Sequence, residues 1–284
     1  MEKPVSYRDA VRRWGETFAA AGVPEATLQA ERLLWHVCGM TPASWLMRRD
    51  EAITEAEQSA YDALAQKRLA RVPLQYITGE QEFMGLPFRV TPDVLIPRQD
   101  TEHSVEEVLA CCDGRRVLDM CTGSGCIAIS VALLGHPASV TGADISGAAL
   151  AVARDNAARL GADVTWVESD MFADIEGEYD VIVSNPPYIP PEQLEGLEPE
   201  VKDHEPRLAL YGGEDGLDYY RTLVREGAKH LRPATDREKG GILIVEIGFD
   251  QGVSVPALFR EAGFAEVRVR KDYAGLDRVV IGHL

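Results

Sequence analysis

The sequence predicts an α/β protein in which a doubly wound, seven-stranded and mostly parallel sheet follows a small helical domain. Two observations lead to this fold class. From residue 99 onward, apolar strand-like segments alternate with helix-like segments, a pattern typical of parallel strands joined by crossover helices. The segment before it, at 1–72, instead shows apolar positions at helical spacing. We therefore predict a helical domain at 1–72, a linker with a short β-hairpin at 73–98 and an α/β domain at 99–284.

Helix start and stop signals divide the predicted helical domain. They are Ser6 with Asp9 as a capping pair, Gly22 as a stop, Pro24 at the first turn of a second helix, Gly39 as its end, and Thr54 with Glu57 as a further capping pair. Three of the four tryptophans lie in this part. They either fill a small core or form a surface that docks a partner.

Seven strands are expected in the larger domain, and a helix near 101–112 precedes them. The strands are 115–120, 139–144, 164–169, 179–184, 241–248, 265–270 and 278–283. Helices near 125, 148–160, 217–231 and 253–262 separate most of them, as a parallel sheet requires. The last two strands have no helix between them, so we expect them to pair antiparallel.

Composition and charge restrict the function classes. The formal net charge is −17, and residues 1–73 carry ten basic and ten acidic side chains, so the whole excess lies in 74–284. This balance counts against a nucleic-acid substrate, because phosphate contacts need Lys and Arg, although a local basic groove could survive it. Five cysteines, an odd number that includes an adjacent pair, make a poor disulfide framework and favour reduced thiols, and no metal-ligand spacing occurs. We expect a cytoplasmic monomer with neither a secretory signal nor a membrane span.

A glycine turn follows the first predicted strand of the sheet. Gly123 and Gly125, with an alanine at the third position after Gly125, match the G-x-G-x-x-G/A fingerprint, and Asp144 ends the next strand at the expected spacing. Glycines let the backbone approach a ligand closely, and a carboxylate at that strand end can accept hydrogen bonds from the two hydroxyls of a ribose. Two ligands fit this pattern: a dinucleotide, or S-adenosyl-L-methionine, which carries no phosphate.

The segment Asn185-Pro186-Pro187-Tyr188 follows the fourth predicted strand, so it should lie over the same cleft. A stiff turn is its structural explanation. Chemically, the Asn185 side-chain oxygen and the Pro186 carbonyl form an acceptor pair that suits a planar –NH2 group, and the Tyr188 ring could lie against the flat face of the substrate. The candidate catalytic residues are therefore Asn185, Pro186 and Tyr188. A methyl-accepting nitrogen fits this arrangement, whereas hydride transfer has no use for it.

These motifs together resemble a known family. Asp-x-x-Thr-Gly-Ser-Gly with Asn-Pro-Pro-Tyr resembles class I S-adenosylmethionine-dependent methyltransferases that modify planar nitrogens. With PLQYITGEQEF from residue 73, VLIPRQDTE at 94–102 and VEIG at 245–248, the chain is similar to the protein-glutamine N5-methyltransferases of peptide chain release factors. The resemblance runs from about residue 6 to the last residue.

The resemblance implies methylation of the glutamine amide in the Gly-Gly-Gln loop of a release factor, with S-adenosyl-L-methionine as the cofactor. It implies that the substrate glutamine is bound by Asn185, Pro186, Pro187 and Tyr188. It implies that the cofactor is bound by Cys121, Thr122, Gly123, Ser124, Gly125, Asp144, Met171 and Asn185. Cys121 stands where many relatives have glycine, and Met171 replaces a frequent aromatic residue. The alternatives are an adenine-N6 or guanine-N2 methyltransferase of nucleic acid and a nicotinamide-dependent oxidoreductase.

Overall fold

The computed structural model describes residues 4–234 and 240–284, and these residues divide into two compact units. The first comprises the chain up to Gly79 together with Pro199–His204, and the second comprises Glu80–Glu198 and Glu205–Leu284. The sequence places a boundary after residue 72, close to the division at 79, but gives no sign that 199–204 belongs with the helices. The predicted domain limits stay a prediction.

The first unit is a helical bundle. Its helices are α1 (Tyr7–Ala20), α2 (Ala26–Cys38), α3 (Pro42–Arg48), α4 (Glu55–Leu69), α5 (Leu74–Thr78) and α10 (Pro199–Lys202). The predicted caps are present: the Ser6 hydroxyl accepts the amide of Asp9 at 3.1 Å, and Thr54 and Glu57 form a capping box. Pro24 lies before α2 rather than in its first turn, because Glu25 adopts a left-handed φ of 47° and the helix begins only at Ala26.

The core of this unit is aromatic and aliphatic. Trp14 and Trp45 are buried, Trp35 packs against them from a half-buried position, and the centre is filled by Phe18, Leu33, Leu34 and Tyr61. The tryptophans predicted to form a small core therefore do so. Burying such large side chains is what stabilises a unit of this size, since each aromatic removes roughly 150–250 Å² of mostly apolar surface from water.

A buried ion cluster also lies within the first unit. The guanidinium of Arg68, which is 2% exposed, donates to Glu200 at 2.5 Å and to the side-chain oxygen of Gln29 at 2.5 Å. Arg71 donates to the other Glu200 oxygen at 2.6 Å. Burial opposes ionisation of Glu200, but hydrogen bonds from the two arginines outweigh it and lower the pKa of Glu200. The cluster holds α10 against α4.

The second unit is a seven-stranded sheet in the order β5-β4-β3-β6-β7-β9-β8. The strands are β3 (Arg116–Met120), β4 (Ser139–Asp144), β5 (Thr165–Glu168), β6 (Val181–Ser184), β7 (Ile242–Glu246), β8 (Ala265–Lys271) and β9 (Asp277–His283). The first five pair in parallel, and β9 pairs antiparallel with β8, as predicted. It also pairs antiparallel with β7, which the sequence does not indicate. The expected hairpin is β1 (Glu80–Phe83) with β2 (Leu86–Arg89).

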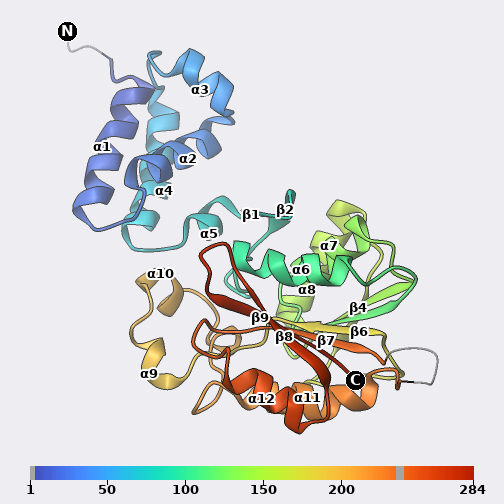
Figure 1. The fold of residues 1–284 in the computed structure, drawn as a ribbon. Helices are drawn as coiled ribbons and strands as arrows, with labels where there is room; N and C mark the ends of the chain where they lie inside the picture. The colour runs from blue at the N-terminus through green and yellow to red at the C-terminus, as the bar shows by residue number, and fades with distance from the viewer. Residues whose placement is uncertain (1–3, 235–239) are drawn as a thin grey trace. The chain divides into compact units, whose positions relative to one another are not determined.

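Helices cover both faces of the sheet (Figure 1). They are α6 (Glu102–Leu109), α7 (Cys126–Leu134) and α8 (Gly147–Leu160) on one face, and α11 (Asp218–His230) and α12 (Ser254–Glu261) on the other. The remaining elements are the short helices η1 (Gln99–Thr101), α9 (Pro191–Leu194) and η2 (Arg207–Ala209). Alternate residues of each strand enter two separate cores, for example Val181 and Val183 in one and Ile182 in the other. A sheet buried on both faces explains the nearly continuous apolar runs of its strands.

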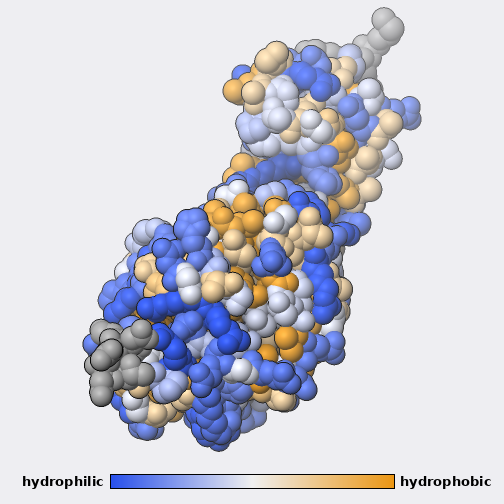
Figure 2. All heavy atoms as spheres, turned by 90° about the vertical axis from the view of Figure 1, so that its right-hand side faces the viewer, coloured by the Kyte–Doolittle hydropathy of each residue, from blue (hydrophilic) through white to orange (hydrophobic). Residues whose placement is uncertain are grey.

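Hydrophilic residues cover much of the face that Figure 2 shows, in keeping with the net charge of −17. Within residues 4–234 and 240–284, no helix combines the length and the apolar character that crossing a membrane would require.

Candidate active site

The glycine turn joins β3 to α7 through backbone conformations that favour glycine. Gly123 and Gly125 have φ values of 56° and 80°, and Cys121 adopts a φ of 62° despite its side chain. At Gly125 space is also lacking, because a Cβ there would lie 2.9 Å from the Trp166 ring. The sequence identifies the turn and its glycines, but it gives no sign that Trp166 packs against them.

Asp144 ends β4 beside this turn. One of its carboxylate oxygens accepts the backbone N–H of Gly123 at 2.8 Å and the other accepts that of Ser146 at 2.9 Å. Burial raises the pKa of Asp144, against the opposing effect of these hydrogen bonds. Each oxygen keeps lone pairs for further donors, so a ligand diol can still bind to this carboxylate.

The turn is poorly suited to a pyrophosphate. In dinucleotide sites the phosphates bind free N–H groups at the start of the helix. Here the N–H of Gly123 donates to Asp144, and the N–H of Ala128 in the first turn of α7 donates to Asp119 at 3.1 Å. Because carboxyl groups already engage these two N–H groups, fewer donors remain for a phosphate, whereas S-adenosylmethionine carries no phosphate and does not need them. The arrangement therefore favours S-adenosylmethionine over a dinucleotide.

Asp119 lies beneath the turn and is fully buried. Its Oδ2 accepts the Thr122 hydroxyl at 2.5 Å, while its Oδ1 has no hydrogen-bond partner among the described residues. Burial raises the pKa of Asp119 to about 7, although the bonds from Thr122 and Ala128 oppose the rise. Because the folded state disfavours the charge, the stability contributed by the protonated acid is full below about pH 4 and is lost as the pH rises toward 7.

Asp119→Asn should remove this pH dependence. The amide oxygen can still accept from Thr122 and Ala128, and the amide has no charge to bury. Between pH 5 and pH 7 we expect the unfolding free energy of the wild type to fall by about 2 kcal/mol more than that of the variant. Urea unfolding of both proteins at several pH values measures the difference. Parallel pH profiles would show that Asp119 is ionised in the folded protein throughout this range.

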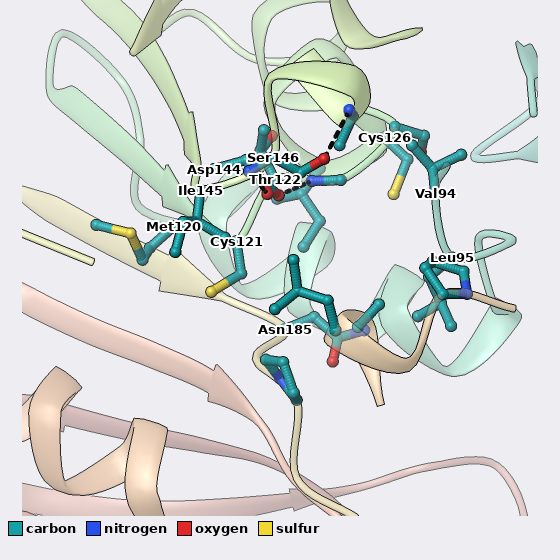
Figure 3. A pocket seen from close by; sticks show the side chains of 18 of the residues that line it. Val94, Leu95, Met120, Cys121, Thr122, Cys126, Asp144, Ile145, Ser146 and Asn185 are labelled. Carbon is teal, nitrogen blue, oxygen red and sulfur yellow. Dashed lines mark hydrogen bonds between the residues drawn. The ribbon is translucent and has the colours of Figure 1, made fainter. Parts of the chain in front are cut away.

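A pocket at the carboxyl ends of β3, β4 and β6 gathers most of the predicted site residues (Figure 3). Asp144 and Thr122 lie on one side of it and Asn185 on another, with Cys121 between them. The predicted residues that line the pocket are Cys121, Thr122, Gly123, Ser124, Asp144, Met171, Asn185 and Pro187. Gly125, Pro186 and Tyr188 are not among its lining residues. Gly125 instead packs against Trp166 behind the turn.

Met171 and Cys121 form a soft, apolar part of the pocket wall. Their sulfur atoms lie 4.0 Å apart, and the Ser169 hydroxyl donates to the Met171 carbonyl at 2.7 Å. Met171 also has a positive φ of 51°, which that hydrogen bond helps to fix. Burial raises the pKa of the Cys121 thiol, so this side chain stays neutral. A thioether and a thiol provide polarizable contacts for a flat ring such as adenine.

The segment after β6 is held in place by hydrogen bonds to other parts of the chain. The amide nitrogen of Asn185 donates to the Thr101 hydroxyl at 3.1 Å, which leaves the amide oxygen available to a ligand in the pocket. Ile189 pairs with the chain at Tyr211, and the side chain of Gln251 donates to the Tyr188 carbonyl at 3.3 Å. Asn185 is thus held at the pocket by contacts to segments distant in sequence.

The Tyr188 side chain lies against a hydrophobic core. Its ring packs from a half-buried position against the core formed with α11 and α12, and burial raises the pKa of its hydroxyl. The side chain is therefore a neutral phenol at physiological pH. Stacking of this ring on a substrate stays a prediction.

Several lining residues have no place among the predicted site residues. Arg98 and Thr101 come from the segment before α6, Leu208 and Ala209 from η2, and Tyr219 from α11. Arg98 is fixed by a two-pronged ion pair with Glu205, at 2.8 and 2.7 Å. The motif at 94–102 marks the first of these segments, but η2 and α11 carry no comparable signal.

Comparison with known proteins agrees with this geometry. Residues 9–79 match the family model described as PrmC N-terminal domain, and residues 103–196 match the one described as Methyltransferase small domain. The release factor glutamine methyltransferase of Moorella thermoacetica is 46% identical over 97% of this chain and 96% of its own length. That of Geobacter sulfurreducens is 44% identical over 94% and 92%.

Solved structures support the fold. A methyltransferase from Pyrococcus furiosus superposes with a TM-score of 0.56 at 20% identity, and the match covers 77% of this chain and 98% of that one. The sheet order, with its antiparallel last strand, is thus that of a class I methyltransferase. Given the identity and the nearly complete coverage of its relatives, the chain belongs to the family of release factor glutamine methyltransferases.

Proposed function

We propose that the protein transfers a methyl group from S-adenosyl-L-methionine to the side-chain nitrogen of the glutamine in the Gly-Gly-Gln loop of a peptide chain release factor. The observation that carries this proposal is the convergence of two half-sites in one pocket. The Asp144 side of the pocket suits an adenosyl group, and the Asn185 oxygen on the other side suits an amide N–H. The names of the relatives supply the substrate class.

In the proposed mechanism the protein positions the amide and stabilises its developing charge. When bound, the cofactor supplies an electrophilic methyl group on a sulfonium. The Asn185 side-chain oxygen and the Pro186 carbonyl accept the two N–H bonds of the substrate amide and orient its nitrogen. As that nitrogen gains the methyl group, positive charge builds on it and its N–H bonds become more acidic, so the same acceptors bind more strongly in the transition state. Water takes the proton that is released.

No side chain of the motif Asn185-Pro186-Pro187-Tyr188 can act as a general base in this step. Asn185 does not titrate, and the Tyr188 hydroxyl stays protonated because burial raises its pKa. Positioning and electrostatic stabilisation therefore have to supply the rate enhancement. Cys121, Thr122, Gly123, Ser124, Gly125 and Met171 are proposed to bind the cofactor, and Pro187 the substrate.

The net charge supports a protein substrate over nucleic acid. A value of −17 repels a phosphate backbone, and Asp93, Asp144 and Asp170 line the pocket itself. We accordingly propose no direct role for nucleic acid, a monomeric enzyme, and action in the cytoplasm, where release factors work.

We further propose that the helical domain at 1–72 docks the release factor. Its short helix α3 presents Leu46 and Met47 to solvent, 64% and 83% exposed, and exposed apolar side chains of this size favour a contact surface. The segment at 73–98 would then link docking to the methyltransferase domain at 99–284.

The proposed function is tested by incubating the enzyme with labelled S-adenosylmethionine and a purified bacterial release factor. We expect one methyl group on the loop glutamine, located by peptide mass spectrometry. A release factor with that Gln→Ala is the matched control and should take up no label. Equal labelling of both factors, or labelling of neither, would overturn the assignment.

A further inference from the structure

Glu246 is a buried acid that the proposed chemistry leaves without a role. It ends β7, is 2% exposed, and one of its oxygens, Oε2, has no hydrogen-bond partner among the described residues. The register of the sheet sets Val245 beside Ser184, so Glu246 and Asn185 are the next residues of two adjacent parallel strands. Residues paired in this way point to the same side of a sheet. Glu246 and Asn185 therefore lie next to each other at the carboxyl edge of the sheet.

Thr101 connects the two side chains. Its oxygen accepts the Asn185 amide N–H at 3.1 Å, and its hydroxyl acts on the Glu246 carboxyl as a hydrogen-bond donor that lowers the pKa of that group. Thr101 is itself 2% exposed, so water does not compete for these interactions. The order Glu246, Thr101, Asn185 is a series of polar contacts that ends at the pocket.

Counting protons along this series of contacts fixes its direction. An ionised carboxylate can only accept, so the single proton of Thr101 must go to Glu246. The Thr101 oxygen is then left as an acceptor, and only the –NH2 end of the Asn185 amide can face it. The amide oxygen must consequently face the pocket, where the substrate N–H is to be bound. A protonated Glu246 would instead donate to Thr101, which would free the Thr101 proton for the Asn185 oxygen and turn the amide round.

We infer that Glu246, acting through Thr101, is a positioning residue that sets the orientation of the Asn185 carboxamide and so makes the pocket an acceptor for the substrate amide. This inference rests on the proposed function and adds the reason why an amide, which could bind either way round, presents its oxygen.

Burial raises the pKa of Glu246 to about 7. The orientation of the Asn185 amide, set through Thr101, should therefore change with pH near neutrality. The bond from Thr101 opposes this rise, as does the positive charge of Arg278. Glu246 interacts electrostatically with several charged or titratable groups, which are Arg98, Asp100, Cys126, Tyr188, Tyr220 and Arg278. Arg278 also forms ion pairs with Asp272 and Asp100, at 3.0 and 3.2 Å.

Two pairs of variants test the inference by rate. Thr101→Val removes the hydroxyl and keeps the shape, whereas Thr101→Ser keeps the hydroxyl. We expect Thr101→Val to lower kcat for release-factor methylation by about 10–100-fold, in the range of a lost positioned group, with less than about threefold change in the KM for the release factor. Thr101→Ser should stay within about threefold of the wild type. Equal losses in both variants, or no loss in Thr101→Val, would overturn the inference.

The pH profile supplies a readout that a merely structural role would not move. The wild-type kcat should rise with pH around a midpoint near 7, as Glu246 ionises. Glu246→Gln is neutral at every pH, and its amide oxygen can still accept the Thr101 proton, so its rate should stay close to the wild-type rate at pH 8 and should not change between pH 6 and pH 8. A wild-type midpoint retained in Glu246→Gln would contradict the assignment.

A spectroscopic measurement keeps the test independent of turnover. The side-chain –NH2 signal of Asn185 in a ¹⁵N-labelled protein is identified by its absence in Asn185→Asp. In the wild type this signal should shift with pH near 7, and in Glu246→Gln and Thr101→Val it should not. If the wild type fails to methylate a release factor but shows this shift, the proposed substrate is wrong and the role of Glu246 and Thr101 stands. A wild-type signal that does not change with pH would contradict the role of Glu246 and Thr101 but leave the proposed function untouched.

Discussion

Asn185→Ala is expected to lower kcat for release-factor methylation by about 100–1000-fold, the loss typical of one positioned hydrogen-bonding group that acts in the transition state. Asn185 lies across the pocket from Asp144, and the bond from its –NH2 group to Thr101 leaves its amide oxygen available as an acceptor. Steady-state kinetics with a purified release factor measures the loss. The dissociation constant of S-adenosylmethionine, measured by calorimetry, should change by less than about threefold, because Asp144 and the glycine turn are untouched.

The matched control for this variant is Gln193→Ala. It removes an amide of the same chemistry from the segment that follows, where the side chain donates to Asp250 at the surface, 3.2 Å away. Its kcat should stay close to that of the wild type. An Asn185→Ala enzyme with full turnover would show that the acceptor pair does not carry the reaction, whatever the fate of the cofactor site.

Glu200→Ala should give the largest loss of stability, about 3–5 kcal/mol in the helical unit, because an uncompensated buried charge costs far more than the net contribution of the pair. The substitution removes the carboxylate that pairs with the buried guanidinium of Arg68 and with Arg71. Hydrogen exchange of the amides in α1, α2 and α4 measures the local unfolding free energy of this unit separately from that of the sheet.

Glu198→Ala serves as the control for this loss. It removes an exposed acid from the same stretch of chain and should change protection by less than about 0.5 kcal/mol. Equal protection in Glu200→Ala and Glu198→Ala would mean that the arginines find other partners, or water, when the acid is removed.

The fold and the side of the pocket formed by the glycine turn and Asp144 could be predicted because their signals are local. A glycine turn between a strand and a helix, with an acid at the end of the next strand, specifies its own geometry within a single strand–helix–strand unit. Asn185 could likewise be assigned to the pocket, since strand ends of a parallel sheet meet at one edge. The antiparallel last strand follows from the missing crossover helix.

The parts that could not be predicted depend on contacts between distant segments. Thr101 meets Asn185 across 84 residues, and Trp166 fills the space beside Gly125 from a neighbouring strand. Nothing in the spacing of either residue indicates its partner. The Tyr188 ring illustrates the same limit, because its motif gives no sign that the ring packs against the core beside α11 and α12. Hydrophobic pattern predicts which elements form, but side-chain packing decides where a given ring points.

The placement of residues 199–204 among the helices has a consequence for synthesis on the ribosome. Helices α1 to α4 leave the exit tunnel early, yet the carboxylate that neutralises Arg68 is encoded 132 residues later. At roughly 5–20 residues per second, that interval lasts about 7–26 seconds. During this time the nascent amino-terminal bundle carries a cationic side chain in its interior with no counter-ion. Its maturation must therefore wait for a part of the chain translated after most of the sheet.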